Sequence, residues 1–203
     1  EGANEAFEAT DVDPAFVTDA DHLHLTSQRP ATADRLAALA DEAGVSVSFD
    51  PGRRLSERDY GDLPERVDVL FLNRREADVA LGDRDPADVV AGTDRVLVVK
   101  HGANGATVHV DGATFEHAGF EVSPVDTTGA GDAFAAGFLA VVLGAWDDAD
   151  SESIRAADFD RALTVANACG AMAACEEGAR TAPPQAAAEA FLAERTETTE
   201  SLE

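Results

Sequence analysis

Short apolar runs alternate with amphipathic stretches along this chain, and that alternation limits the fold more than any other feature of the sequence. The runs, rich in Val, Leu and Phe, predict strands, and the stretches between them have the apolar spacing of helices. Because short buried strands separated by helices form a mostly parallel sheet covered on both faces, we expect a three-layer α/β/α sandwich. The predicted strands are residues 22–26, 45–49, 67–72, 96–99 and 106–110, and the predicted helices are residues 32–43, 76–81, 85–91, 133–143, 158–176 and 184–195.

A different pattern follows the fifth predicted strand. Asp111 and Gly112 lie between two alternating segments, which is typical of a two-residue hairpin turn. We therefore expect one antiparallel strand near the edge of the sheet. No repeat or low-complexity linker divides the sequence, so we expect residues 1–203 to form a single domain.

Acidic residues dominate the charge of the protein. Forty Asp and Glu against 15 Lys and Arg give a formal net charge of −25, and Lys100 is the only lysine. This balance excludes a nucleic-acid-binding protein that works through a basic face, and it excludes simple adhesion to anionic lipid. We interpret the charge as adaptation to a very salty cytoplasm, where screening removes the self-repulsion. An ordinary acidic protein is the alternative.

The sequence has no sign of a membrane or export segment. Its apolar runs do not approach the roughly 18 residues that a membrane span needs. The first ten residues have neither the basic nor the apolar region of a signal peptide. We therefore expect a soluble cytoplasmic protein whose partner is a small molecule.

The segment VDTTGAGDAFAAGFLAVVL, residues 125–143, carries the clearest chemical information. We expect a short strand to end in its glycine-rich turn and an apolar helix to begin directly afterwards. Gly129, Ala130 and Gly131 would then let backbone N–H groups converge at the positive end of the helix dipole, which makes an anion site. A carboxylate at Asp132 suits a base that takes a hydroxyl proton while the amides stabilise a phosphoryl group. The alternative is that Asp132 is only a helix N-cap and the glycines only form a tight turn.

The string DTTGAGDAF, followed by a helix of small residues, resembles the C-terminal signature of the ribokinase-like, or PfkB, carbohydrate kinases. Further segments resemble the family's motifs and occur in the family's order. These are FDPGRR from Phe49 to Arg54, with Gly52 where the family usually has Asn, then NRREA, KHGANGA and ANACGAMAACEEGA. The resemblance covers essentially the whole chain but only the C-terminal two thirds or so of the family pattern. It implies that the first strands, the lid and the Gly-Gly sugar motif are missing.

The resemblance also implies an activity. A ribokinase-like fold would transfer phosphate from ATP to a hydroxyl group of a sugar or sugar-like alcohol. Asp132 would be the base that contacts the substrate, and the Gly129–Gly131 amides would form the anion hole. A nucleoside or vitamin-precursor kinase of the same superfamily, and a nucleotide-binding module without turnover, are the alternatives. A homodimer is one candidate assembly.

Two further sites follow from the resemblance. Asn73 and Glu76 would hold Mg²⁺, directly or through water, near the nucleotide phosphates; a surface helix start capped by Asn73 is the alternative. Lys100 would reach a phosphate or pair with an acidic residue, and Thr26 is a weaker candidate for the sugar site. The other candidate nucleotide contacts are Gly102, Asn104, Gly105 and Asn167, for which a strand connection and a buried amide are the alternatives.

A monovalent cation site is the last expectation. In some relatives of this family, K⁺ is held at positions that correspond to Asp126, Thr128, Ala173, Glu176 and Gly178. The alternative is that Asp126 only braces the turn before Gly129.

Overall fold

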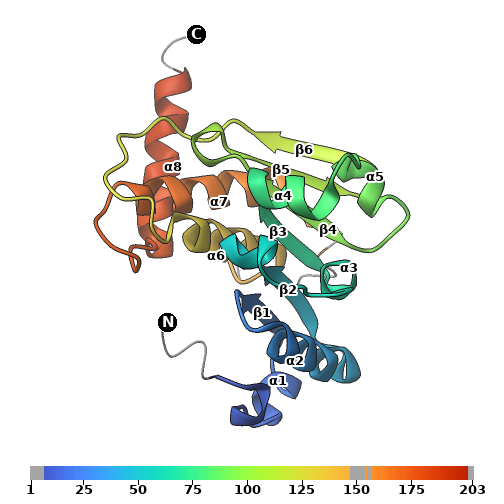
Figure 1. Ribbon diagram of the computed structural model, residues 1–203. Helices are drawn as coiled ribbons and strands as arrows, with labels where there is room; N and C mark the ends of the chain where they lie inside the picture. Colours follow the sequence, from blue (N-terminus) through green and yellow to red (C-terminus); the bar gives the residue numbers. More distant parts are fainter. Residues whose placement is uncertain (1–6, 147–153, 155–156, 201–203) are drawn as a thin grey trace. The chain divides into compact units, whose positions relative to one another are not determined.

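A computed structural model of the chain describes residues 7–146, 154 and 157–200, and of residues 197–200 only the backbone (Figure 1). Six strands form one sheet in the order β1-β2-β3-β4-β5-β6, and the β1–β2 and β2–β3 pairs are parallel. This confirms the expected α/β class with a mostly parallel sheet. The strands are β1 His22–Thr26, β2 Ser46–Asp50, β3 Val69–Asn73, β4 Val96–Lys100, β5 Ala106–Val110 and β6 Ala113–His117.

All six predicted helices are present, with ends that shift by up to five residues. They are α2 Pro30–Ala43, α4 Arg74–Leu81, α5 Pro86–Val90, α6 Ala130–Val142, α7 Phe159–Ala174 and α8 Gln185–Glu200. Sequence periodicity missed the short helices η2 Ala9–Asp11, α1 Ala15–Thr18, η3 Gly52–Ser56, α3 Leu63–Arg66 and η4 Gly102–Asn104. These helices have three to five residues each, and such short segments carry little of a helical period. Among the helices of the described residues, none is long and apolar enough to cross a membrane.

Contacts divide the chain into two compact units. The first comprises Glu1–Val99 and His109–Ala113, and the second comprises Lys100–Val108 and Thr114–Glu203. Each unit is described by itself below. The single domain expected from the sequence stays a prediction.

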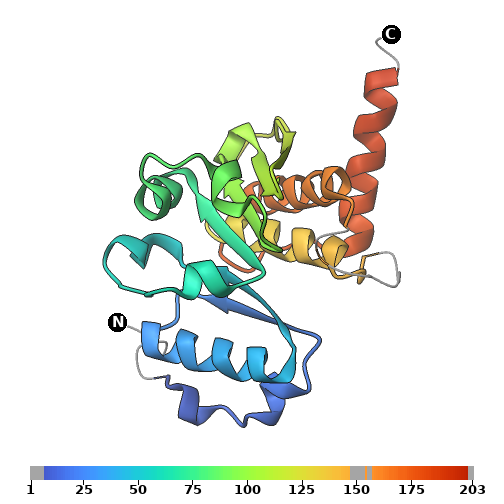
Figure 2. The ribbon, with the colours of Figure 1, turned by 90° about the vertical axis from the view of Figure 1, so that its right-hand side faces the viewer.

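In the first unit, helix α2 covers one face of β1 and β2 (Figure 2). Alternation within the strands turns Leu25 and Phe49 toward this core, where they are 1% and 0% exposed. Ala33 and Leu36 of α2 belong to the same buried cluster. Pro30 begins the helix, and Gly44, in the left-handed conformation at φ +72°, ends it. The apolar pattern of the sequence therefore accounts for the core of this unit.

The other face of β1 and β2 carries polar side chains that hydrogen-bond to one another. His22 Nδ1 lies 2.7 Å from Ser46 Oγ, and His22 Nε2 lies 2.8 Å from Ser48 Oγ. His24 Nδ1 lies 2.7 Å from the same Ser48 oxygen. Burial and the neighbouring His24 lower the pKa of His22 to about 4. The neutral imidazole therefore takes part in this network at neutral pH.

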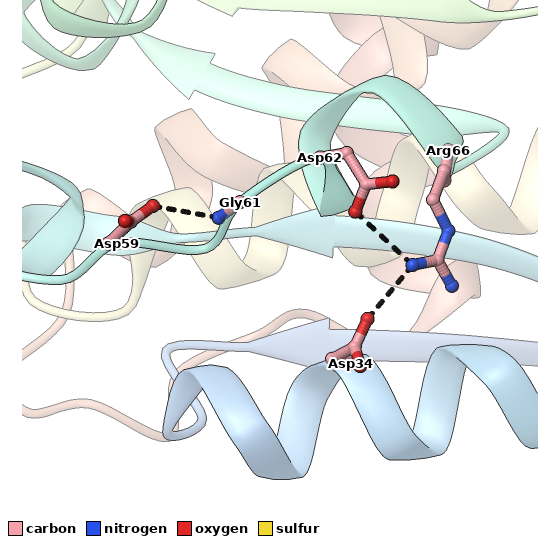
Figure 3. A network of polar contacts seen from close by, with 5 residues as sticks. All are labelled: Asp34, Asp59, Gly61, Asp62 and Arg66. Atoms are coloured by element: carbon pink, nitrogen blue, oxygen red, sulfur yellow. Dashed lines mark hydrogen bonds and ion pairs between the residues drawn. The ribbon is translucent and has the colours of Figure 1, made fainter.

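A cluster of polar contacts joins α2 to α3 (Figure 3). The Arg66 guanidinium donates to Asp34 Oδ1 at 2.9 Å and to Asp62 Oδ1 at 3.3 Å. Nearby, the Gly61 N–H donates to Asp59 Oδ1 at 2.9 Å and closes a turn before α3. These side chains are well exposed, so the cluster holds the connection in place but adds little to overall stability.

In the second unit, α6 and α7 lie side by side and α8 packs against α7 (Figures 1 and 2). Small residues allow the close approach of α6 and α7. A Cβ atom on Gly137 would lie 2.9 Å from Cys169 Sγ, and one on Gly170 would lie 3.2 Å from Ala130 O. Larger side chains at either position would push the two helices apart. The Gly170 contact also fixes the position of the first turn of α6.

The hairpin predicted from Asp111 and Gly112 is confirmed. The two residues connect β5 to its neighbour β6 and have φ values of +47° and +78°. Two positive φ angles in a two-residue connection are typical of a type I′ turn, which suits the twist of an antiparallel pair.

The strand expected just before the glycine-rich turn is absent. Residues 118–128 contain no strand, and Val125 is 62% exposed. The N–H groups of Val125 and Asp126 both donate to Ala174 O, at 2.8 and 3.2 Å. Val125 is therefore apolar without being part of a sheet. The end of α7, rather than a neighbouring strand, supplies the hydrogen-bond acceptor for its N–H group.

Candidate active site

The N-terminus of α6 has the backbone geometry of an anion site. Gly129 is the N-cap at φ +83°, and no side chain caps the helix. A Cβ atom on Gly129 would lie 2.6 Å from Ala179 O, so only glycine fits this position. The Ala130 N–H donates to Thr127 O at 3.2 Å. The N–H groups of Gly131 and Asp132 follow in the first turn, where a helix provides no acceptors of its own.

Asp132 is exposed at the third position of α6. The interpretation of Asp132 as the N-cap is therefore wrong, because Gly129 occupies that place. The carboxylate lies within the first turn and is accessible from solvent. It is available to accept a proton from a ligand that binds at this helix end.

Lys100 lies beside the same helix end. It is the last residue of β4, and a Cβ atom on Gly131 would lie 3.6 Å from its Nζ. An anion at this helix end would be attracted both to the ammonium group and to the positive end of the helix dipole. The structure thus brings together Lys100 and the Gly129–Asp132 turn, which are 29 residues or more apart in the sequence.

The turn after Lys100 is open to solvent. Gly102, Ala103 and Asn104 are exposed, whereas Gly105 is buried. Asn167, on α7, is 7% exposed, and its Nδ2 donates to Leu163 O at 2.8 Å. The hydrogen bond to Leu163 O supports the interpretation of Asn167 as a satisfied buried amide. Its role beside a nucleotide base stays a prediction.

Asn73 and Glu76 form a reciprocal capping box at the start of α4. The Asn73 N–H donates to Glu76 Oε2 at 2.9 Å, and the Glu76 N–H donates to Asn73 Oδ1 at 2.9 Å. Asn73 Nδ2 also donates to Glu76 Oε1 at 2.5 Å. Asn73 is thus the helix cap, but Glu76 is only 5% exposed, which an ordinary surface helix start does not require.

The turn after β1 is strained and tightly held. Thr26 is exposed, and Ser27 has a φ of +50°, which is unusual for a residue other than glycine. The Ser27 hydroxyl donates to Pro51 O at 3.0 Å and occupies the space where a side chain at residue 52 would begin. This contact and the φ of +65° favour glycine at residue 52.

Gln28 is a candidate that the sequence did not reveal. Its backbone oxygen accepts from Arg58 Nη1 at 3.1 Å and from the Tyr60 hydroxyl at 2.9 Å. Its side-chain Oε1 is buried without a hydrogen-bond partner among the described residues. A buried acceptor of this kind needs a donor from water or a ligand. In the sequence, only Gly52, which contacts Ser27, pointed to the turn after β1.

Oxygen atoms converge where the end of α7 meets the turn before α6. Asp126 accepts from the Thr128 hydroxyl and N–H and from the Gly178 N–H, and these hydrogen bonds hold the pKa of its carboxyl group below the usual value. The Thr181 hydroxyl, which the sequence analysis missed, lies 3.2 Å from Ala173 O and 3.3 Å from Gly178 O. Glu176 is exposed, and its N–H donates to Ala173 O at 3.3 Å. Asp126 therefore does brace the turn.

Thr26, Asn73 and Glu76 belong to the first unit, and the other predicted site residues belong to the second. Within the described part of the chain, no three His, Cys, Asp or Glu side chains form a metal-binding group. Besides carboxylates, the oxygen atoms at these places include the side-chain amide oxygen of Asn73 and the backbone oxygens of Ala173 and Gly178. Such oxygen-rich groups suit hard cations rather than zinc.

Comparisons with known proteins found similar sequences and similar folds. The sequence matches the pfkB family of carbohydrate kinases over residues 1–186. It is 50% identical to the ATP-dependent ribose-1-phosphate kinase of Halopiger xanaduensis over 195 residues, which cover 96% of this chain and 62% of that protein. The chain therefore spans less than two thirds of that relative.

Solved structures give the same picture of the fold. An Escherichia coli protein described as a ribokinase II, solved with ATP and Mg²⁺, is similar with a TM-score of 0.76 at 23% identity, covering 94% of this chain and 64% of that one. A double mutant of Vibrio cholerae fructokinase, solved with fructose, ADP and a potassium ion, is similar with a TM-score of 0.69 at 27% identity, covering 92% and 64%.

Proposed function

The chain belongs to the pfkB family of carbohydrate kinases, and from that premise we propose that it carries the catalytic part of an ATP-dependent kinase for a sugar or sugar-like alcohol. The observation that carries the proposal is the N-terminus of α6. It combines uncapped amides, an exposed carboxylate at Asp132 and the ammonium group of Lys100 beside Gly131. A cation, free amides and a base at one helix end fit phosphoryl transfer better than simple phosphate storage.

Asp132 is the proposed base. A sugar hydroxyl is a poor nucleophile until its proton has an acceptor, and an exposed carboxylate can take that proton as the bond from oxygen to the γ-phosphorus forms. The bond from the γ-phosphorus to the bridging oxygen breaks in the same transfer, and ADP leaves. Binding of the sugar would shield the carboxylate from water.

The amides and Lys100 have a separate task in this proposal. The N–H groups of Gly131 and Asp132 meet the negative charge on the transferring phosphoryl oxygens, as the anion hole that the Gly129–Gly131 turn creates. Lys100 adds a positive charge at the same place. The exposed Gly102–Asn104 turn and Asn167 are the proposed contacts to the rest of the nucleotide.

The Asn73–Glu76 pair suits a place in the outer coordination shell of a Mg²⁺ ion, where it would contact the water molecules bound to the ion. Both Glu76 oxygens already accept hydrogen bonds, so the carboxylate is better placed to hold the water shell of the ion than to bind it directly. When bound, Mg²⁺ would neutralise charge on the nucleotide phosphates. Asn73 keeps Glu76 oriented for this role.

A K⁺ ion fits the oxygens around Asp126, Thr128, Ala173, Glu176 and Gly178. Support comes from the two carbonyl groups that lie within 3.3 Å of the Thr181 hydroxyl and from the ionised Asp126. The turn between α7 and α8 contacts Gly129 through Ala179. A cation there would stiffen the backbone that shapes the anion hole.

The similar ribose-1-phosphate kinase suggests a pentose phosphate among the acceptors to be tested. Thr26 and the unpartnered oxygen of Gln28 are the proposed contacts to acceptor hydroxyl groups. A nucleoside or vitamin-precursor kinase is the second candidate activity, and a module that binds nucleotide without turnover is the third. The homodimer stays a prediction.

One experiment separates these candidates. The complete gene product is assayed for ADP release with ATP, Mg²⁺ and a panel of sugars, sugar phosphates and nucleosides in KCl. Release with a sugar or sugar phosphate supports the proposal, and release with nucleosides alone favours the second activity. ATP binding without release on any acceptor would contradict the kinase and favour the binding module.

A further inference from the structure

Two glycines at the open end of the β5–β6 hairpin bring two segments of backbone into direct contact. Gly105 comes just before β5, and Gly119 follows closely after β6. A Cβ atom on Gly105 would overlap His117 O and lie 2.5 Å from the Gly119 N. A side-chain rotation could not relieve this overlap, because the neighbouring atoms belong to the backbone.

Gly119 meets the same restriction from the other side. A Cβ atom there would lie 2.9 Å from the Gly105 N and 3.0 Å from Ala103 O. Its φ of +84° is also a conformation that glycine adopts without strain. The Gly119 N–H donates to His117 Nδ1 at 3.0 Å, which holds the segment in this shape. Residues 117–119 therefore lie against the Gly102–Gly105 turn.

That turn is closed by its own hydrogen bonds and begins directly after Lys100. The His101 N–H donates to Gly105 O at 2.7 Å, and the Gly105 N–H donates to Gly102 O at 3.1 Å. His101 Nε2 lies 3.2 Å from Thr107 Oγ1. A displacement of Gly105 would therefore act on His101, which directly follows Lys100, the residue whose ammonium group lies beside Gly131.

We propose that Gly119 is a positioning residue for the nucleotide site: by close backbone contact with Gly105, it fixes the Gly102–Gly105 turn and the place of Lys100 over the N-terminus of α6. This inference rests on the proposed function, since it assumes that the turn and Lys100 contact ATP. Gly119 itself acts through the turn, and it does not contact the transferring phosphoryl group.

The chain offers a matched control in Gly112. Its φ of +78° is close to that of Gly119, but a Cβ atom there would meet nothing within 4 Å. Gly112→Ala and Gly119→Ala therefore pay the same kind of left-handed backbone penalty. Only Gly119→Ala forces the turn to move. A difference between the two variants isolates the effect of the contact.

The test compares ATP binding to the parent and both variants by titration calorimetry with ATP and Mg²⁺. We expect Gly119→Ala to weaken ATP binding about 10- to 100-fold, as a misplacement near 1 Å does, and Gly112→Ala to bind within about twofold of the parent. In the kinase assay on the complete gene product, Gly119→Ala should raise the KM for ATP and leave the KM for the acceptor unchanged. A loss of both would indicate general structural damage and contradict the inference.

The failure of the inference is distinct from that of the proposed function. If the parent binds ATP and Gly119→Ala binds it as tightly as Gly112→Ala, only the positioning role is wrong. If the parent binds no ATP, the proposed function fails and this inference fails with it.

A second measurement decides the matter if Gly119→Ala does not fold. Hydrogen exchange of the parent is followed with and without ATP. We expect ATP to slow exchange at the amides of residues 102–105 and 117–119 together, because the two segments share one contact. Protection of residues 102–105 alone would overturn the inference.

Discussion

At the scale of the residue, Glu76 combines a place in the capping box of α4 with burial. The hydrogen bonds to Asn73 explain the start of α4 completely. The residue is 5% exposed, although a capping box works equally well at the surface. Burial of an acidic side chain costs free energy, and a bound cation is one way to recover it.

Glu76→Gln tests this interpretation. The substitution keeps the shape of the side chain but removes its charge, so half-maximal activity should require about tenfold more Mg²⁺. Asp85→Asn, which changes the acidic cap of α5 and keeps a capping side chain, should leave the Mg²⁺ titration unchanged. If the titration of Glu76→Gln overlays that of the parent, the Asn73–Glu76 pair is only structural.

At the scale of the element, the polar face of β1 and β2 depends on how the two strands pair. The parallel register places His22 opposite Ser46 and His24 opposite Ser48. The sequence predicted both strands, but the hydrogen bonds between their polar residues follow from the register alone. Because the pKa of His22 falls to about 4 in the folded chain, protonation favours the unfolded state.

The sign of this effect leads to a pH prediction. Between pH about 6.5 and about 4, the unfolded chain binds a proton that folded His22 does not, so the free energy of unfolding falls as the pH falls. His117, whose pKa burial also lowers, acts in the same direction. Thermal melting over this range should show a steeper acid loss for the parent than for His22→Asn. Parallel curves for the two proteins would contradict the role of His22.

The elements that the sequence predicted correctly are those with a strong local pattern. The five apolar runs became strands, and Asp111-Gly112 became a hairpin turn, because burial and positive φ leave direct marks on residue type. The short strand expected before the glycine-rich turn is absent, and the N–H groups of Val125 and Asp126 donate instead to Ala174 O, which lies far away in the sequence. The place of Lys100 beside Gly131 and the unpartnered Gln28 oxygen likewise depend on tertiary contacts.

At the scale of the whole molecule, the charge of −25 acts on stability and solubility rather than on chemistry. The similar kinase from Halopiger xanaduensis, a halophilic archaeon, supports the interpretation of a protein adapted to salt. Exposed contacts such as Arg66–Asp34 weaken when salt screens them. The larger effect of screening is to reduce repulsion among 40 acidic residues.

Raising KCl from dilute buffer into the molar range should therefore raise the melting temperature. NaCl at the same ionic strength separates this effect from occupation of a K⁺ site. A rise in both salts supports screening, and an additional rise in KCl alone supports the site around Asp126. A flat or falling melting temperature in both salts would exclude the halophilic interpretation.

The central claim is that Asp132 is the base and the neighbouring amides are the anion hole. The most direct measurement is the turnover of Asp132→Asn in the complete gene product at saturating acceptor and ATP. Asp160→Asn is the control, because Asp160 is an exposed acidic residue in the first turn of α7. We predict that Asp132→Asn lowers kcat by about 10² to 10⁴ with little change in ATP affinity, while Asp160→Asn keeps parental turnover. Near-parental turnover of Asp132→Asn would contradict the mechanism.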